Sequence, residues 1–142
     1  MEIDQEKLQQ LYDTAMKQIY SEAVLDHGKN PRNLEDLEQS NAFGIVTGPC
    51  GDTMAMWLNI KDDSIAGISF TTDGCMTSLA AGSMTTEIAK GKSLSDVQKL
   101  SQQDILDALG GFPEESEHCA LLAINTLNEA IKDYLSSKET SE

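Results

Sequence analysis

Residues 54–72, with the sequence MAMWLNIKDDSIAGISFTT, decide the fold of this chain. Large apolar side chains occupy every second position from 54 to 60, and this period of two predicts a β-strand with one buried face. Residues 61–64 (KDDS) form a turn candidate, and a second alternating run follows them. A third short strand is expected near residues 43–47. Consecutive strands joined by tight turns predict an antiparallel meander.

Helical patterns flank this predicted sheet on both sides. From about residue 5 to residue 25, apolar residues recur at steps of three and four, which predicts one amphipathic helix that ends around Gly28 and Pro31. After the sheet we expect a helix over 77–89, then two short helices capped by serines and reaching residues 100 and 109. The apolar stripe of the last helix covers about 117–135.

The length of 142 residues is that of one ordinary domain. We therefore expect a single α+β domain over residues 1–136, in which helices pack on one face of a three-stranded antiparallel sheet. Residues 137–142 are expected to be a polar C-terminal tail.

The chain is strongly acidic, with 24 Asp and Glu against 10 Lys and Arg and a formal net charge of -14. Nucleic acids and anionic membranes are bound by clustered basic side chains, so neither is expected as a partner. No apolar run approaches the ~20 residues of a membrane span, and the charged N-terminus lacks the apolar core of a signal peptide. The expected location is cytoplasmic, where thiols stay reduced.

Three cysteines, Cys50, Cys75 and Cys119, are the main functional candidates. They are too far apart in the sequence to form a CxxC zinc knuckle, and an odd number cannot pair fully in disulfides. Each lies at a predicted element boundary, and Cys75 and Cys119 stand at the starts of helices. The unpaired N–H groups and the dipole of a helix start lower the pKa of a thiol there. Metal binding or thiol chemistry is therefore the favoured interpretation.

Two neighbouring side chains can complete a metal site. Asp52 lies two residues after Cys50 and offers a carboxylate, while His118 precedes Cys119 and offers an imidazole. A set of Cys, Asp and His suits zinc or iron rather than calcium or magnesium. Structural roles are the alternative: each cysteine as a small buried side chain, Asp52 as a turn cap, and His118 bonded to a nearby acid in the first turn of the helix.

Five segments of the chain form one ordered set of motifs: VLDH running into NPRN (24–33), GPCGD (48–52), TDGC (72–75), TEIAKGK (86–92) and HC (118–119). In this order they resemble the IscU/NifU-type iron–sulfur cluster assembly scaffolds, and the resemblance covers nearly the whole length. It implies an IscU/SufE-like α+β fold with a three-stranded antiparallel sheet, in agreement with the periodicity.

The resemblance implies a role for each candidate residue. Cys50, Cys75 and Cys119 match the cysteines that receive sulfur and hold a nascent cluster. Asp52 matches an aspartate that tunes cluster lability and can be a fourth ligand, and His118 matches an alternative ligand to cluster or zinc. The implied cofactors are iron and a transient [2Fe–2S] cluster, with zinc in the resting or purified protein. The implied partners are a cysteine desulfurase and recipient apoproteins or carrier proteins.

The chain also departs from the family pattern. A Leu-Pro-Pro-Val-Lys segment, which a specialised Hsp70-type chaperone recognises, commonly precedes the His-Cys pair, whereas residues 112–116 read FPEES here. This counts against docking of that chaperone. Gly28 stands where an aromatic residue often follows the Asp-His pair. A zinc-dependent, sulfur-accepting branch of the family carries an insertion between the second and third cysteines. With 43 residues between Cys75 and Cys119, this chain lacks that insertion.

The favoured function is therefore a non-enzymatic scaffold that accepts sulfur from a cysteine desulfurase, binds iron and passes a [2Fe–2S] cluster to apoproteins. The alternative is a SufU-like sulfurtransferase, in which a zinc-bound cysteine accepts the sulfur. A hydrolase with a cysteine nucleophile is disfavoured. Only His27 and His118 could serve as its base, and an adjacent His-Cys pair rarely aims both side chains at one substrate.

Overall fold

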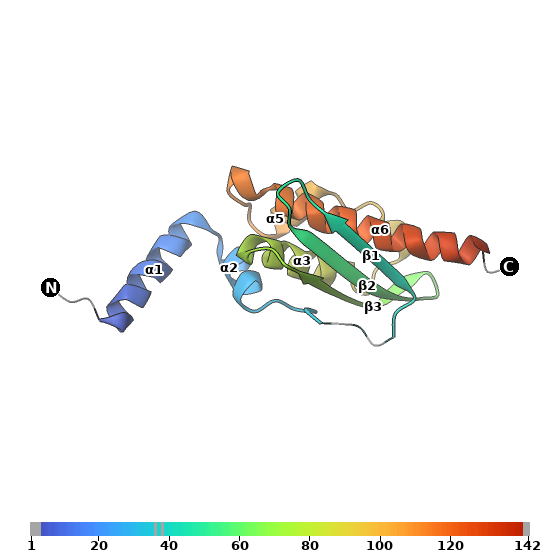
Figure 1. Ribbon diagram of the computed structural model, residues 1–142, viewed down its shortest axis with the longest axis horizontal. Coiled ribbons are helices and arrows are strands. Elements are labelled where there is room, and N and C mark those ends of the chain that lie inside the picture. Colours follow the sequence, from blue (N-terminus) through green and yellow to red (C-terminus); the bar gives the residue numbers. More distant parts are fainter. Residues whose placement is uncertain (1–3, 36, 38, 141–142) are drawn as a thin grey trace.

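The predicted sheet is present in a computed structural model, which describes residues 4–35, 37 and 39–140 (Figure 1). Its strands are β1 (Ala42–Thr47), β2 (Thr53–Lys61) and β3 (Ser64–Thr72). They lie in the order β1-β2-β3, and both pairings are antiparallel. The predicted α+β class and antiparallel meander are therefore confirmed.

The alternating pattern of β2 explains how the sheet acquires an inner face. The large apolar side chains at positions 54, 56, 58 and 60 are at most 3% exposed. The predicted turn joins β2 to β3 through Asp62 and Asp63, whose φ angles are 54° and 57°. Two positive φ angles in a two-residue loop give the turn a twist that matches the twist of the strands, and Asp tolerates this conformation.

Two helices cover the inner face of the sheet, α3 (Met76–Ala89) and α6 (His118–Thr140). Figure 1 views the sheet from its open face, with these helices behind it. Strand β1 and helix α6 approach each other very closely. A Cβ atom on Gly44 of β1 would lie 2.5 Å from the backbone nitrogen of Ala130 in α6. Only glycine fits there, because a backbone atom cannot move aside as the end of a flexible side chain can.

The α3 helix is the central element of the helical layer. It contacts β3 on one side, and α2 (Glu22–Lys29) and α6 on others. Nine of its 14 residues are buried, and all nine are Ala, Gly, Ser or Thr. Small side chains allow neighbouring elements to approach from several directions, so α3 needs no single apolar stripe.

Three short elements connect α3 to α6: α4 (Leu94–Val97), α5 (Gln102–Ala108) and the 3-10 turn η1 (Glu114–Ser116). Ser93 caps α4 by accepting a hydrogen bond from the N–H of Asp96. Ser101 caps α5 through a reciprocal capping box with Asp104. The prediction of two short serine-capped helices is confirmed, although α4 ends three residues and α5 one residue before its predicted end.

The prediction of one long first helix is wrong. The segment forms α1 (Gln5–Ile19) and then α2, with a break at Tyr20 and Ser21. The Ser21 hydroxyl accepts a hydrogen bond from the N–H of Val24, and it donates one to the carbonyl of Leu109. The apolar period continues across the break, which combines a local cap with a tertiary contact, both made by the Ser21 hydroxyl. No residue of α1 is buried, and α1 projects away from the domain (Figure 1).

One predicted helix end is confirmed and one differs from the structure. The helical region ends between Gly28 and Pro31 as expected, since α2 ends at Lys29. An added Cβ at Gly28 would overlap the side chain of Met76 in α3, so the glycine permits close packing of two helices. The last helix continues to Thr140, five residues beyond its predicted end. The division between residues 1–136 and a tail stays a prediction.

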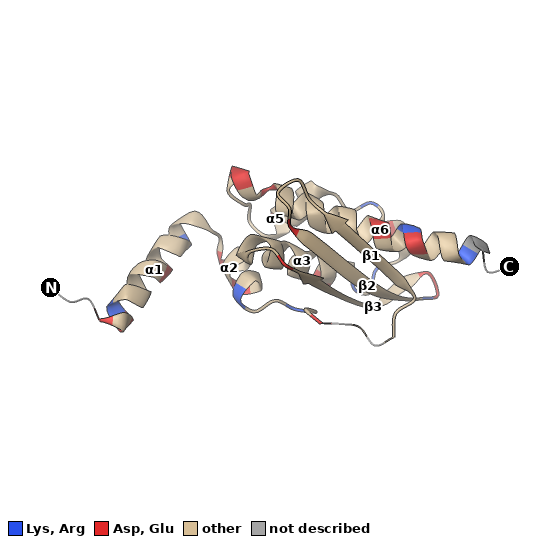
Figure 2. Ribbon diagram, in the orientation of Figure 1, with Lys and Arg blue, Asp and Glu red and all other residues tan. Residues whose placement is uncertain are grey.

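Charged residues lie mainly outside the sheet (Figure 2). The three strands contain one charged residue, Lys61, whereas acidic residues occur at η1 and at the β2–β3 turn. Within the described residues, no helix is both long enough and apolar enough to span a membrane.

Candidate metal and sulfur site

The three cysteines come from separate elements that meet at one end of the sheet. Cys50 lies in the turn that leads into β2, Cys75 is the N-cap residue of α3, and Cys119 is the second residue of α6. These placements confirm the predicted element boundaries. Their exposure differs: Cys50 and Cys75 are exposed, whereas Cys119 is 1% exposed.

Asp52, His118 and Cys119 form the tightest group of donor atoms. One ligand atom from each lies within 4.8 Å of the other two. The donors of a tetrahedral zinc or iron site stand roughly 3.4–3.8 Å apart, as follows from metal–ligand distances of about 2.1–2.3 Å. Small side-chain rotations therefore suffice for this group to hold one metal ion. A thiolate, an imidazole and a carboxylate fit zinc or iron.

One hydroxyl group, that of Thr77, links this group to Cys75, and a second, that of Ser78, links two members of the group. The Thr77 Oγ1 atom lies 3.1 Å from the Cys75 sulfur and 3.4 Å from the Cys119 sulfur. The Ser78 hydroxyl donates to Asp52 Oδ2 at 3.1 Å and lies 3.5 Å from the Cys119 sulfur. Sequence reasoning missed both residues. Their only signal was their position, two and three residues after a cysteine that opens a helix.

Cys50 and Cys75 lie outside the close group formed by the other three site residues, and Cys50 is carried by a turn. The next residue, Gly51, has a φ of 87° and has open space around the position of a Cβ. The turn itself is closed by hydrogen bonds between Gly48 and Asp52 and between Gly51 and Gly48. The turn thus holds Cys50 at an open edge of the site.

The pKa of Cys75 is lowered, as predicted for a thiol at a helix start. Partial burial acts to raise its pKa. Hydrogen bonding by the Thr77 hydroxyl and attraction to the N–H groups of Thr77 and Ser78 outweigh that effect, although neither N–H closes a capping hydrogen bond. Cys75 is thus an accessible sulfur with enhanced thiolate character.

The same prediction is wrong for Cys119, whose pKa is raised. Burial is the main cause, and it exceeds the stabilisation of the thiolate by Thr77 and Ser78. Cys75 and Asp52 raise the pKa further, because they place negative charge near the sulfur. Without a metal ion, Cys119 is therefore a protected thiol. A bound cation would favour its thiolate form.

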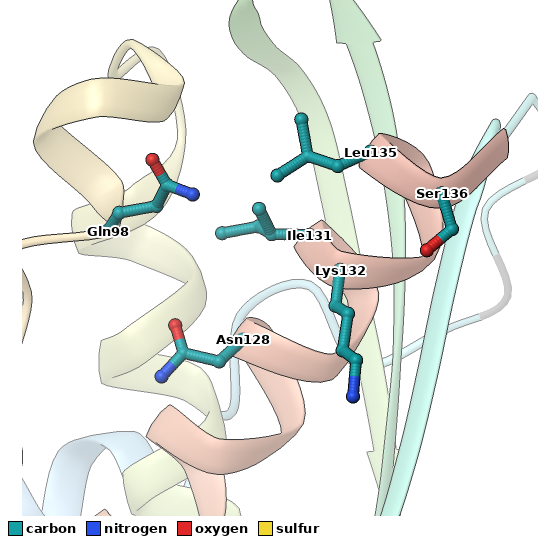
Figure 3. Close-up of a pocket in the computed structure, with 6 residues that line it drawn as sticks. All are labelled: Gln98, Asn128, Ile131, Lys132, Leu135 and Ser136. Carbon is teal, nitrogen blue, oxygen red and sulfur yellow. The ribbon is translucent and has the colours of Figure 1, made fainter. Parts of the chain in front are cut away.

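Two pockets lie along α6, one beside the turn that carries Cys50 and one away from the cysteines. A pocket of about 120 Å³ lies between the Cys50 turn and α6, with Gly48, Pro49 and His118 in its wall. A larger pocket of about 380 Å³ lies further along α6, away from all three cysteines (Figure 3). The smaller pocket shows that the turn is not packed tightly against the helix that carries His118.

His27, unlike His118, lies outside the group of metal-binding candidates. Its Nδ1 atom lies 2.7 Å from the Ser83 hydroxyl. His27 therefore links α2 to α3. The pKa of His27 is lowered, mainly by burial. The hydrolase interpretation is left with His118, whose Nε2 atom lies 3.7 Å from the sulfur of the buried Cys119.

The chain is similar in sequence to known iron–sulfur cluster assembly scaffold proteins. The scaffold protein IscU 1 of Archaeoglobus fulgidus is 42% identical over 117 residues, which is 82% of this chain and 76% of that protein. The scaffold protein IscU of Aquifex aeolicus is 43% identical over 119 residues, with the same shares. Both are described as iron–sulfur cluster assembly scaffold proteins.

The fold has relatives among solved structures. The N-terminal part of a NifU-like protein from Brucella abortus superposes with a TM-score of 0.67 at 17% identity, covering 85% of this chain and 97% of that structure. The profile of the family described as "NifU-like N terminal domain" matches residues 19–141. The chain therefore belongs to the NifU-like N-terminal domain family.

Proposed function

We propose that this protein is a scaffold on which an iron–sulfur cluster is assembled and from which it is released. The observation that carries the proposal is the convergence of Cys119, Asp52 and His118, with Cys75 one hydroxyl group away. The scaffold relatives at 42–43% identity support the same function.

Sulfur enters the site by persulfide exchange with a cysteine desulfurase. An accessible thiolate attacks the outer sulfur of the persulfide, so a new S–S bond forms and the desulfurase thiolate leaves. The exposure and lowered pKa of Cys75 suit it to this attack, and Cys50 is the other exposed thiol. Conversion of each delivered sulfur to sulfide then takes two electrons from an external donor protein.

The donor set suits a cluster that must be given up. Three thiolates supply soft ligands for iron, and Asp52 or His118 fills a fourth position less firmly than a fourth thiolate would. Proteins that keep a cluster for electron transfer commonly use four cysteines. An incomplete thiolate set therefore favours transfer of a [2Fe–2S] cluster to recipient apoproteins or carrier proteins.

A zinc-bound sulfur acceptor is the second candidate function. The specific observation in its favour is that Asp52, His118 and Cys119 already suit a single ion without Cys50. In that case zinc occupies the site before sulfur arrives, and one thiolate leaves the metal to accept the persulfide.

Anaerobic reconstitution with ferrous iron and sulfide separates the two candidates. A scaffold is expected to develop the visible absorption of a cluster and to transfer it to an apo-ferredoxin. Tight stoichiometric zinc, together with failure to form a visible-absorbing cluster after the zinc has been removed, contradicts the scaffold proposal and favours the sulfur acceptor.

The segment before the site bears on a chaperone partner. Residues 114–116 form the acidic turn η1, in which no residue is buried. Docking of an Hsp70-type chaperone that reads Leu-Pro-Pro-Val-Lys is therefore not part of the proposal.

A further inference from the structure

One buried hydroxyl group connects two of the candidate sulfur ligands. Thr77 is 4% exposed, and its Oγ1 atom is within hydrogen-bonding distance of both Cys75 and Cys119. Cys75 is the N-cap residue of α3, whereas Cys119 lies in α6. A single side chain thus spans the junction at which the site is built.

The neighbouring hydroxyl cannot replace it. Ser78 also approaches the Cys119 sulfur, but its hydroxyl donates to the carboxylate of Asp52. A hydroxyl group has one proton, and an ionised carboxylate can only accept hydrogen bonds. Thr77 is therefore the hydroxyl in this group whose proton is available to a sulfur atom.

Other buried threonines of this protein do not place their hydroxyl groups next to sulfur atoms. Thr86 and Thr126 donate to backbone carbonyls of their own helices, as threonine commonly does. Thr85, on the same helix as Thr77, is buried and its hydroxyl has no partner. Thr77 instead places its hydroxyl between the two sulfurs: its single proton goes to one sulfur, and its oxygen can accept from the S–H of the other.

We propose that Thr77 is a positioning residue that holds the sulfur atoms of Cys75 and Cys119 in register for a shared metal centre. This inference rests on the proposed function, because it assumes that both cysteines are ligands. Hydrogen bonds from outside the coordination sphere orient a ligand and tune its donation to the metal. Loss of the Thr77 hydroxyl therefore changes both the affinity and the spectrum of the centre.

The test is an anaerobic titration with Co²⁺, whose thiolate-to-metal absorption reports the sulfur ligands directly. In Thr77→Val, which keeps the shape of the side chain, the Co²⁺ affinity should fall by about 10- to 100-fold, the range seen when outer-shell partners of metal ligands are removed. The thiolate-to-cobalt bands should also shift. Thr77→Ser restores the hydroxyl and should recover both readouts.

Thr85→Val is the matched control, since it removes a buried hydroxyl from the same helix without touching the site. It should leave affinity and spectrum unchanged. If Thr77→Val binds Co²⁺ like the unmodified protein and gives the same spectrum, the inference is overturned while the proposed function stands. If the unmodified protein shows no thiolate-to-cobalt absorption, the proposed function itself fails.

Circular dichroism and thermal unfolding accompany each variant. Should Thr77→Val unfold, Thr77→Ala removes the hydroxyl without placing a methyl group in its position. If both hydroxyl-free variants unfold while Thr85→Val stays folded, Thr77 serves the fold rather than the metal centre, and the inference is also overturned.

Discussion

The site has two halves that differ in how firmly the fold holds them. At the junction of α3 and α6, Cys119 is 1% exposed and is contacted by two hydroxyl groups. At the β1–β2 turn, Cys50 is exposed, and the adjacent Gly51 has open space around it. The difference suits a site that must both retain and exchange its contents. The buried half fixes the geometry, and the open half gives access to donors and recipients.

Thiol alkylation should show the largest difference between the two halves. At neutral pH, iodoacetamide should modify Cys50 and Cys75 at least about 100-fold faster than Cys119, because Cys119 reacts only after local opening. Mass spectrometry of the metal-free protein over time measures this. The reaction needs the thiolate, so the lowered pKa of Cys75 should make its rate level off at a lower pH than that of an ordinary thiol. Equal rates at Cys50 and Cys119 would contradict the two-part description.

Added methyl groups should distinguish the packed region from the open turn. Gly44→Ala forces a Cβ against the backbone of α6 and should cost about 3 kcal/mol of unfolding free energy. Gly51→Ala meets no neighbour and should cost about 1 kcal/mol, from the positive φ alone. Urea denaturation of the metal-free variants gives both values. A larger cost at Gly51 would show that the turn is more tightly packed than described.

Loss of the buried ligand Cys119 should lower the cluster yield more than loss of the exposed ligand Cys50. We expect Cys119→Ser to reduce the cluster yield on anaerobic reconstitution by about tenfold or more, in line with losses on perturbing a metal site. Cys50→Ser should reduce the yield less, because the remaining donors keep their geometry. Visible absorbance per protein and iron analysis give the yields. The reverse order would assign the anchoring role to the turn.

The smallest effect concerns the carboxylate that joins the two halves. Asp52→Ala should make a reconstituted cluster survive a few-fold longer against oxygen and chelators, because His118 in the same group can then hold the position that the weakly bound carboxylate exchanges with water. Decay of the visible absorbance measures the lifetime. Asp107→Ala, at an exposed acid on α5, is the control. An unchanged lifetime in Asp52→Ala would remove the role assigned to that carboxylate.

The sheet and its helical cover were predictable because they depend on local periodicity. The period of two in β2 and the positions of the turns and capping serines were visible in the sequence, and each has a local physical cause. The break between α1 and α2 was not predictable. Ser21 lies inside an unbroken apolar pattern, and its contact with the Leu109 carbonyl joins residues 88 positions apart.

For the site, the sequence was sufficient to identify Cys50, Asp52, Cys75, His118 and Cys119 as candidates and to place each cysteine at an element boundary. Only the tertiary structure decided how they are arranged. It buried Cys119 and thereby raised the pKa of its thiol against the effect of the helix start. It also brought Thr77 between two sulfurs from different helices. The physical reason is that burial and hydrogen bonding across elements depend on which surfaces meet, and local sequence does not encode that.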